Sequence, residues 1–284
     1  MQEHHTGYQP DSVAVIGVGS ALDAALQKRL QRAGFRVQLL AAAELGELRP
    51  GSIVINASAC GGRRGMSTAL DVCEQLAQIN SGNLIHLSSC QVFRGGERKV
   101  YDEEALPQPD CEAGCEWLAC EAALGGCENL ITLRFGWMVD LDEDALLGRI
   151  LRSLVAGRPV SLDDQSRGSP VTVSDMARVT VAVAQQLASG APSSGIYHYG
   201  SADSCTAMEF AREVVERAQS FCDEDLSAAL SPLEEGEARS VVLACGKLRD
   251  VFGIQQRSWR QGLTRQVELW LERLGKMRRD EFAL

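Results

Sequence analysis

Residues 12–23, with the sequence SVAVIGVGSALD, combine an apolar run, a glycine-rich turn and the start of a helix. Ser12 to Gly17 has the length and composition of a short buried strand, and the segment from Ser20 to Ala33 carries apolar residues at helical spacing. A glycine-rich turn between two such elements lets a pyrophosphate approach the backbone at the helix N-terminus. This stretch predicts the first strand, turn and helix of a Rossmann-type nucleotide-binding domain.

The remainder of the first half repeats this alternation of strand and helix. We expect strands over residues 35–40, 52–57, 83–88 and 130–135, and helices over residues 66–79 and 113–123. Short apolar strands that alternate with such helices indicate a parallel sheet, and right-handed crossovers then place helices on both of its faces. The predicted fold class is therefore α/β, with a Rossmann-type doubly wound parallel sheet.

The second half predicts a smaller C-terminal α/β lobe. We expect helices over residues 144–156, 174–188, 208–219 and 259–274, a strand over 195–199, a polar loop over 163–170 and a mobile acidic loop over 223–239. Ser174 and Asp175 are the expected N-terminal caps of their helix. The expected organisation is a polar tail (1–11), a nucleotide-binding domain (12–140) and a substrate lobe (141–284) that is partly interleaved with it.

The composition argues against a nucleic acid, a membrane or a metal ion as a partner of this protein. The formal net charge is −10 and the four lysines are scattered, so we expect no nucleic-acid partner. Because the chain shows neither an apolar run of membrane-spanning length nor a signal peptide, we expect a cytoplasmic protein with no membrane partner. The ten cysteines are then expected to be reduced thiols. The spacing of Cys111, Cys115, Cys120 and Cys127 fits no known zinc or cluster site, so we expect no metal.

The glycine-rich turn lacks the third glycine of a dinucleotide-binding motif. One register of the motif places Leu22 at the third position, and the other places Ser20 and Asp23 at the second and third. If Asp23 faced a bound pyrophosphate, each like-charge pair at about 5 Å would cost on the order of 3 kcal/mol at an effective dielectric constant of about 20. The second strand also ends in LLAA (39–42), without a ribose-binding acid or an arginine for a 2′-phosphate. NAD(P) is the cofactor that the fold indicates, with binding that is weak or lost.

Six segments carry a resemblance to a known family. They are VINASA (54–59), IHLSS with VF (85–93), LR with a following Trp (133–137), DQ with GSP (164–170), GIYH (195–198) and KLR with FG (247–253). In this order they resemble dTDP-4-dehydrorhamnose reductase and its relatives among the extended short-chain dehydrogenases, over residues 12–270. The resemblance implies a cleft between two lobes in which NADPH reduces a 4-keto sugar nucleotide.

The resemblance also assigns the family's functional residues to positions of this chain. The catalytic Ser or Thr falls on Ser89, the Tyr position holds Ala113 and the Lys position holds Trp117, a register supported by the flanking Gly114 and Glu121. The proton donor and the residue that activates it are therefore both absent. The candidate cofactor-binding residues are Gly17, Gly19, Ser20, Asn56, Ala57 and Ser88. The candidate substrate-binding residues are Tyr101, Arg134, Trp137, Gln165 and Ser169.

Several of these residues also have a purely structural interpretation. Ser88 and Ser89 end a strand at the sheet edge where ligands bind, and either role is open for them. Arg134 fits a structural ion pair as well as a ligand contact, and His86 is expected in the core. Asn56 is expected to brace the loop after its strand, with a cofactor contact as the alternative.

The missing Tyr and Lys favour a catalytically degenerate relative of the family, a ligand-binding, regulatory or scaffold protein, and leave enzyme activity open. Its partner would be a nucleotide or sugar nucleotide, another protein or a second copy of the chain. The alternative is an active NAD(P)-dependent reductase or epimerase that acts on a sugar nucleotide and whose proton donor is Tyr101 or a water held by Ser89. A third hypothesis is a thiol-dependent or metal enzyme that uses Cys90 and the cysteines between residues 111 and 127.

Overall fold

The computed structural model describes residues 12–79, 82–97, 99–192, 194–221, 230–233 and 238–275. Its central sheet has six strands, all parallel: β1 (Ser12–Ile16), β2 (Arg36–Leu40), β3 (Ile53–Asn56), β4 (Leu84–Ser89), β6 (Leu130–Phe135) and β11 (Gly195–Tyr199). Their spatial order is β11-β6-β4-β3-β1-β2, so β2 and β3 lie on opposite sides of β1. Ligands bind at such a switch point in open α/β sheets. The predicted α/β fold class is confirmed.

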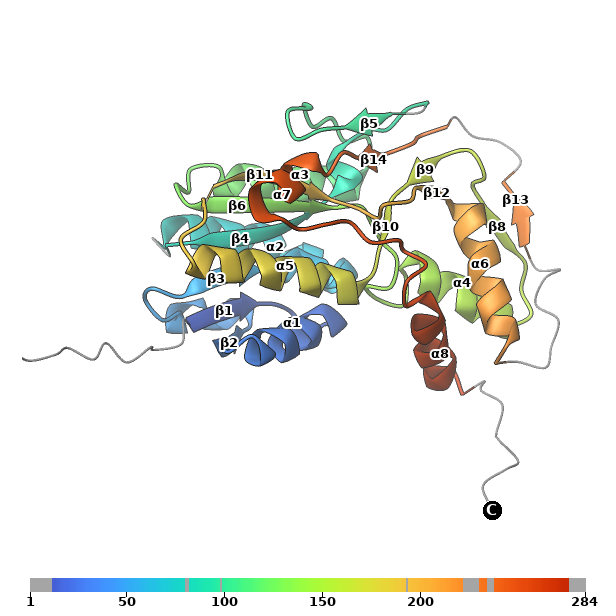
Figure 1. Ribbon diagram of the computed structural model, residues 1–284, viewed down its shortest axis with the longest axis horizontal. Helices are drawn as coiled ribbons and strands as arrows, with labels where there is room; N and C mark the ends of the chain where they lie inside the picture. Colours follow the sequence, from blue (N-terminus) through green and yellow to red (C-terminus); the bar gives the residue numbers. More distant parts are fainter. Residues whose placement is uncertain are drawn as a thin grey trace, which may run out of the picture.

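Helices cover both faces of this sheet, as Figure 1 shows. The helices are α1 (Ala21–Arg32), α2 (Gly62–Gln78), α3 (Glu112–Leu124), α4 (Leu146–Val155), α5 (Val173–Ala188), α6 (Ala207–Gln219), α7 (Gly246–Phe252) and α8 (Leu263–Arg273). α1 packs beside α5 on one face, and α2 packs beside α3 on the other. Such an arrangement follows from right-handed crossovers between parallel strands.

The buried apolar side chains form two clusters. The first joins the sheet to the helices on its faces and includes Val15, Ile55 and Leu133, none of them more than 1% exposed. The second joins α4, α6 and α8, with Ile150 and Phe210 among its members. These three helices lie beside the sheet in Figure 1. Because α5 and α7 belong to the first cluster, the chain passes between the clusters more than once after residue 139.

Several boundaries differ from the expectations. α2 begins at Gly62 and not at residue 66. Thr172, not Ser174, is the N-cap of α5, and its hydroxyl accepts a hydrogen bond from the Asp175 amide at 3.3 Å. α8 begins at Leu263 because Gly262 adopts a left-handed conformation with φ of 83° directly before it. The expected loop over 163–170 contains a short strand, β9 (Arg167–Gly168). The predicted tail (1–11) and most of the predicted acidic loop (222–229 and 234–237) lie outside the described residues.

Short strands complete the second half of the chain. They are β5 (Val100–Tyr101), β7 (Trp137–Met138), β8 (Val160–Leu162), β10 (Pro170–Val171), β12 (Cys205–Thr206), β13 (Leu230–Pro232) and β14 (Val242–Leu243). Each pairs with a single other short strand, β9 with β12, so they connect loops and build no second large sheet among the described residues. No helix in the described part of the chain is long and apolar enough to cross a membrane.

Candidate functional site

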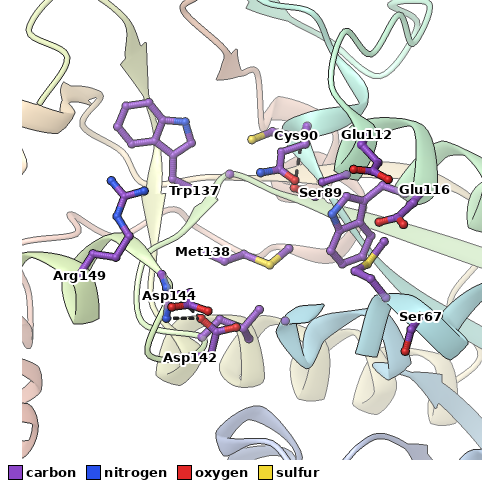
Figure 2. A pocket seen from close by; sticks show the side chains of 18 residues that line it. Ser67, Ser89, Cys90, Glu112, Glu116, Trp137, Met138, Asp142, Asp144 and Arg149 are labelled. Atoms are coloured by element: carbon purple, nitrogen blue, oxygen red, sulfur yellow. Dashed lines mark hydrogen bonds between the residues drawn. The ribbon is translucent and has the colours of Figure 1, made fainter. Parts of the chain in front are cut away.

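A cavity of about 860 Å³ opens at the carboxyl edge of the sheet (Figure 2). Residues after β4 and β6, the start of α2, one side of α3 and the start of α4 surround it. Its described lining residues are Gly62, Met66, Ser67, Ser89, Cys90, Gln91, Glu112, Ala113, Glu116, Trp117, Gly136, Trp137, Met138, Leu141, Asp142, Asp144, Ala145 and Arg149. The edge at which open α/β sheets generally bind ligands is therefore hollow in this protein.

Helix α3 carries the two positions assigned to the missing Tyr and Lys. Cys111 caps its N-terminus, with Sγ accepting a hydrogen bond from the Gly114 amide at 3.4 Å. Gly114 allows α3 to lie close to the loop after β4, because a Cβ there would overlap the Gln91 carbonyl oxygen. Ala113 and Trp117, one turn apart, both line the cavity. The Trp117 side chain is only 5% exposed and belongs to the first apolar cluster.

Ser89 and Cys90 form the part of the cavity wall at the end of β4. Ser89 is 4% exposed, and its hydroxyl accepts a hydrogen bond from the Gln91 amide at 3.2 Å. Burial raises the pKa of the Cys90 thiol to about 12, so the group is a protonated thiol at neutral pH. A protonated thiol is a poor nucleophile, and Cys90 is therefore not activated for covalent chemistry.

A second cavity, of about 520 Å³, lies over the glycine-rich turn between β1 and α1. Val18, Gly19 and Ser20 line it together with the loop from Asp140 to Glu143. The Ser20 hydroxyl accepts from the Asp23 amide at 3.2 Å, and the Asp23 carboxylate accepts from the Ser20 amide at 2.7 Å, which makes a complete capping box.

Ser88 and Arg134 lie away from both cavities, beneath α3. The Ser88 hydroxyl donates to Glu121 Oε1 at 2.5 Å. Arg134 donates to both carboxylate oxygens of Glu121, from Nε at 2.9 Å and from Nη2 at 2.7 Å. Arg134 is 2% exposed, so this bidentate pair is buried, and breaking such a pair leaves an uncompensated charge. Both residues act here in packing α3 against the sheet.

Asn56 braces the loop after β3. Its Oδ1 accepts from the Ser58 amide at 3.1 Å and from the Ser58 hydroxyl at 2.7 Å. Its Nδ2 lies 3.3 Å from Nδ1 of His86, which is fully buried. Burial lowers the pKa of His86 to about 4, so the ring is neutral at pH 7. Ala57 is also fully buried, and neither it nor Asn56 lines a cavity among the described pockets.

The five candidate substrate residues are dispersed. Trp137 lines the main cavity, whereas Gln165 lines a separate groove and Ser169 is 1% exposed against Gly136. Tyr101 stacks on Phe93 with ring centroids 4.3 Å apart, and its hydroxyl accepts from the Gly95 amide at 3.1 Å. With Arg134 paired beneath α3, only Trp137 of the five meets Ser89, Ala113 and Trp117 at the cavity.

The sequence reasoning missed the charged residues of the cavity. Glu112 and Glu116 lie one helical turn apart on α3, and Asp142 and Asp144 belong to the loop after β7. Arg149 is the single cationic side chain among the described lining residues, at the end of the cavity opposite Glu112 and Glu116 in Figure 2. Two features of the sequence could have indicated these residues. They are the i, i+4 spacing of Glu112 and Glu116 beside the assigned Tyr and Lys positions, and the acidic sequence DLDED (140–144).

The described cysteines are free thiols. Cys111 and Cys115 are exposed, Cys120 is buried and Cys127 is half-buried. No group of three or more His, Cys, Asp or Glu side chains in the described part of the chain is arranged to hold a metal ion. The metal hypothesis therefore finds no assembled site among these residues.

A doubly wound parallel sheet with a cavity at its carboxyl edge defines a Rossmann-type protein. The chain belongs to the family described as the RmlD substrate binding domain, which it matches over residues 67–271. The resemblance to dTDP-4-dehydrorhamnose reductases is thereby confirmed at the level of the family. Among the curated proteins, none matches the chain in sequence.

Solved structures resemble the whole described fold. A dTDP-4-dehydrorhamnose reductase from Clostridium acetobutylicum ATCC 824 has a TM-score of 0.73 and 17% identity, over 91% of this chain and 99% of that chain. A second, from Bacillus anthracis in complex with NADP, has a TM-score of 0.72 and 19% identity, over 90% and 98%. MoeE5, in complex with UDP-glucuronic acid and NAD, has a TM-score of 0.70 and 20% identity, over 93% and 100%. At these identities the likeness shows a shared fold.

Proposed function

We propose that this chain is a non-catalytic member of its family, which uses the cleft to bind a ligand or the surface around it to bind another protein. The observation that carries the proposal is the pair Ala113 and Trp117 on the cavity wall of α3. An alanine has no transferable proton, and an indole is neither an acid at neutral pH nor a cation. A general acid typically contributes about 10²- to 10⁴-fold to a rate, and both parts of the family's acid are missing.

The described cavity wall carries carboxylates, Glu112 and Glu116 among them, but no phenol and no ammonium group in place of the family's Tyr and Lys. It contains no tyrosine, lysine or histidine among its described residues. Tyr101, the substitute that the sequence suggested, is held by the stack on Phe93 and by the Gly95 amide, and it is not among the lining residues. These contacts weigh against the active reductase or epimerase as the second hypothesis.

Trp117 supports the proposal through its volume as well as its chemistry. A buried tryptophan contributes a large apolar area to the core, and its position is the one that the resemblance gives to the lysine. The family's lysine holds the nicotinamide ribose, so a packed indole leaves that ribose without its anchor. The indole thus fills the lysine position in the absence of a cofactor. This suits a protein that binds a ligand or a partner and catalyses no reaction.

Solved relatives with this fold hold NADP, or NAD together with UDP-glucuronic acid. By the family relationship we propose a small-molecule ligand for the 860 Å³ cavity, a volume in the range of ligand pockets. A partner protein or a second copy of the chain is compatible with the same proposal, because a cleft that no longer supports catalysis can still bind another molecule. We further propose that NAD(P) binding is weak or lost.

The experiment measures binding and turnover on the purified protein. We expect no binding of NADPH or NADH by calorimetry at millimolar cofactor, and no reduction of dTDP-4-dehydrorhamnose when NADPH absorbance is followed. A dTDP-4-dehydrorhamnose reductase with the Tyr and Lys present is the positive control. Steady NADPH consumption by this chain at a rate typical of enzymes would overturn the proposal.

A further inference from the structure

The glycine-rich turn holds a carboxylate of the protein itself. Asp23 Oδ2 accepts a hydrogen bond from the Val18 amide at 3.0 Å and another from the Ser20 amide at 2.7 Å. These are amides of the turn that, in a Rossmann-type site, faces a bound pyrophosphate. Asp23 is 4% exposed, so its carboxylate is enclosed by the turn and does not extend into solvent.

Gly17 shows how closely the turn fits this carboxylate. A Cβ added to Gly17 would overlap the carboxyl carbon and both carboxyl oxygens of Asp23. The glycine is therefore required by the packing of Asp23 in the absence of any nucleotide. Burial raises the pKa of the neighbouring Cys60 thiol, and the negative charge of Asp23 adds to that rise, so Asp23 also acts on the interior beneath the turn.

A second carboxylate, that of Asp142, lies at the start of α2 and lines both cavities. A Cβ added to Gly62, the first residue of α2, would overlap Oδ2 of Asp142. Asp142 is held in this position by its Oδ1, which accepts from the Asp144 amide at 2.9 Å and from the Ala145 amide at 2.8 Å. The N-terminal ends of α1 and α2 thus both have an internal carboxylate beside them, where the helix dipole favours negative charge.

We propose that Asp23 is a built-in substitute for a phosphate group and makes the cleft select against ligands that would place a phosphate on the glycine-rich turn. The inference rests on the proposed function, because only a protein released from turnover can do without the cofactor's pyrophosphate. A phosphate entering the turn would have to displace hydrogen bonds that are already made and approach a buried like charge. The ligand of the 860 Å³ cavity therefore binds without a phosphate on this turn.

The first test measures ADP binding by calorimetry, because ADP carries the pyrophosphate and lacks the nicotinamide. We expect no binding by the parent protein and a gain of about tenfold or more in affinity for Asp23→Gly, which removes the carboxylate. Asp23→Asn keeps the shape and the hydrogen-bond acceptor but loses the charge, so its affinity should fall between the two. Asp71→Asn, at an exposed position of α2, removes a charge outside the turn and should leave ADP binding unchanged.

The second test is a double-mutant cycle read by thermal melting, which needs no ligand. Gly17→Ala should lower the melting temperature of the parent, because the new methyl group overlaps Asp23. In the Asp23→Gly background the same change should cost little, since the overlapping group is gone. An equal loss in both backgrounds would show that Gly17 does not serve Asp23, and would overturn the inference.

The outcomes separate this inference from the proposed function. Tight ADP binding by the parent protein, without reduction of any sugar nucleotide, would overturn the inference and leave the non-catalytic proposal standing. A folded Asp23→Gly variant that binds ADP no better than the parent would likewise overturn it. Turnover of NADPH by the parent is the separate result that contradicts the proposed function.

Discussion

At the residue scale, Asp140 is a buried carboxyl group whose ionisation opposes folding. It is 6% exposed, and its Oδ1 accepts a hydrogen bond from the Val173 amide at 2.6 Å, the first amide of α5. Burial raises its pKa from 3.8 to about 6, in spite of that hydrogen bond, which acts in the opposite direction. The folded state therefore binds this proton more tightly than the unfolded state does.

The stability that this proton contributes is complete below the unfolded pKa of 3.8 and is lost as the pH rises through about 6. Asp140→Asn cannot ionise and keeps an acceptor for the Val173 amide. We expect the variant to gain up to about 3 kcal/mol over the parent between acidic and neutral pH, measured by urea unfolding across that range. Glu143→Gln, at an exposed position of the same loop, is the control. A stability difference that stays constant with pH would contradict this expectation.

The sequence predicted which residues occupy the family's functional positions. It predicted less well the direction in which each of these side chains points. The spacing between Ser89 and α3 located Ala113 and Trp117, which meet at one cavity. Ser88 and Ser89 point to opposite faces because successive strand residues alternate, but periodicity alone does not say which face holds the ligand. The sequence fits two roles for Arg134, because its pairing with Glu121 depends on how α3 packs against the strand.

At the element scale, α3 owes its position to the burial of Trp117 and Cys120 between the helix and the sheet. We expect Trp117→Ala to lower the free energy of unfolding by about 3–5 kcal/mol, the usual cost of removing a large buried aromatic side chain. Glu116→Ala, at the adjacent exposed position, should change it by less than about 0.5 kcal/mol. Chemical denaturation measures both, and equal small effects would place the indole outside the core.

The long elements of the first half were predicted because the strands are continuous apolar runs, as in β1, and the helices carry apolar residues at helical spacing, as in α1. The short strands gave no such signal, since two residues such as Val100 and Tyr101 cannot define a period. The start of α8 was placed too early because Trp259 is buried and continues the apolar pattern. The backbone turn at Gly262, which begins the helix, leaves no trace in that pattern.

At the scale of the whole molecule, the cleft combines parts that are distant in sequence. The turn at Asp23 lies between β1 and α1, whereas Ala113 and Trp117 belong to α3 on the opposite face of the sheet. In the family these two regions hold different parts of one cofactor, the pyrophosphate and the nicotinamide ribose. The division of the chain at residue 140 into two domains stays a prediction, since the two apolar clusters exchange segments beyond it.

If the turn and α3 exclude the cofactor independently, the gains in binding free energy from restoring each region should be additive. We expect Ala113→Tyr with Trp117→Lys to raise NADPH affinity modestly, because the turn still holds Asp23. Adding Asp23→Gly should tighten NADPH binding by a further factor of about ten or more over the double variant, because separated sites usually contribute independently. Calorimetry measures the affinities, and thermal melting checks that each variant is folded. A triple variant that binds NADPH no tighter than the double variant would mean that the turn and α3 do not contact the same bound cofactor.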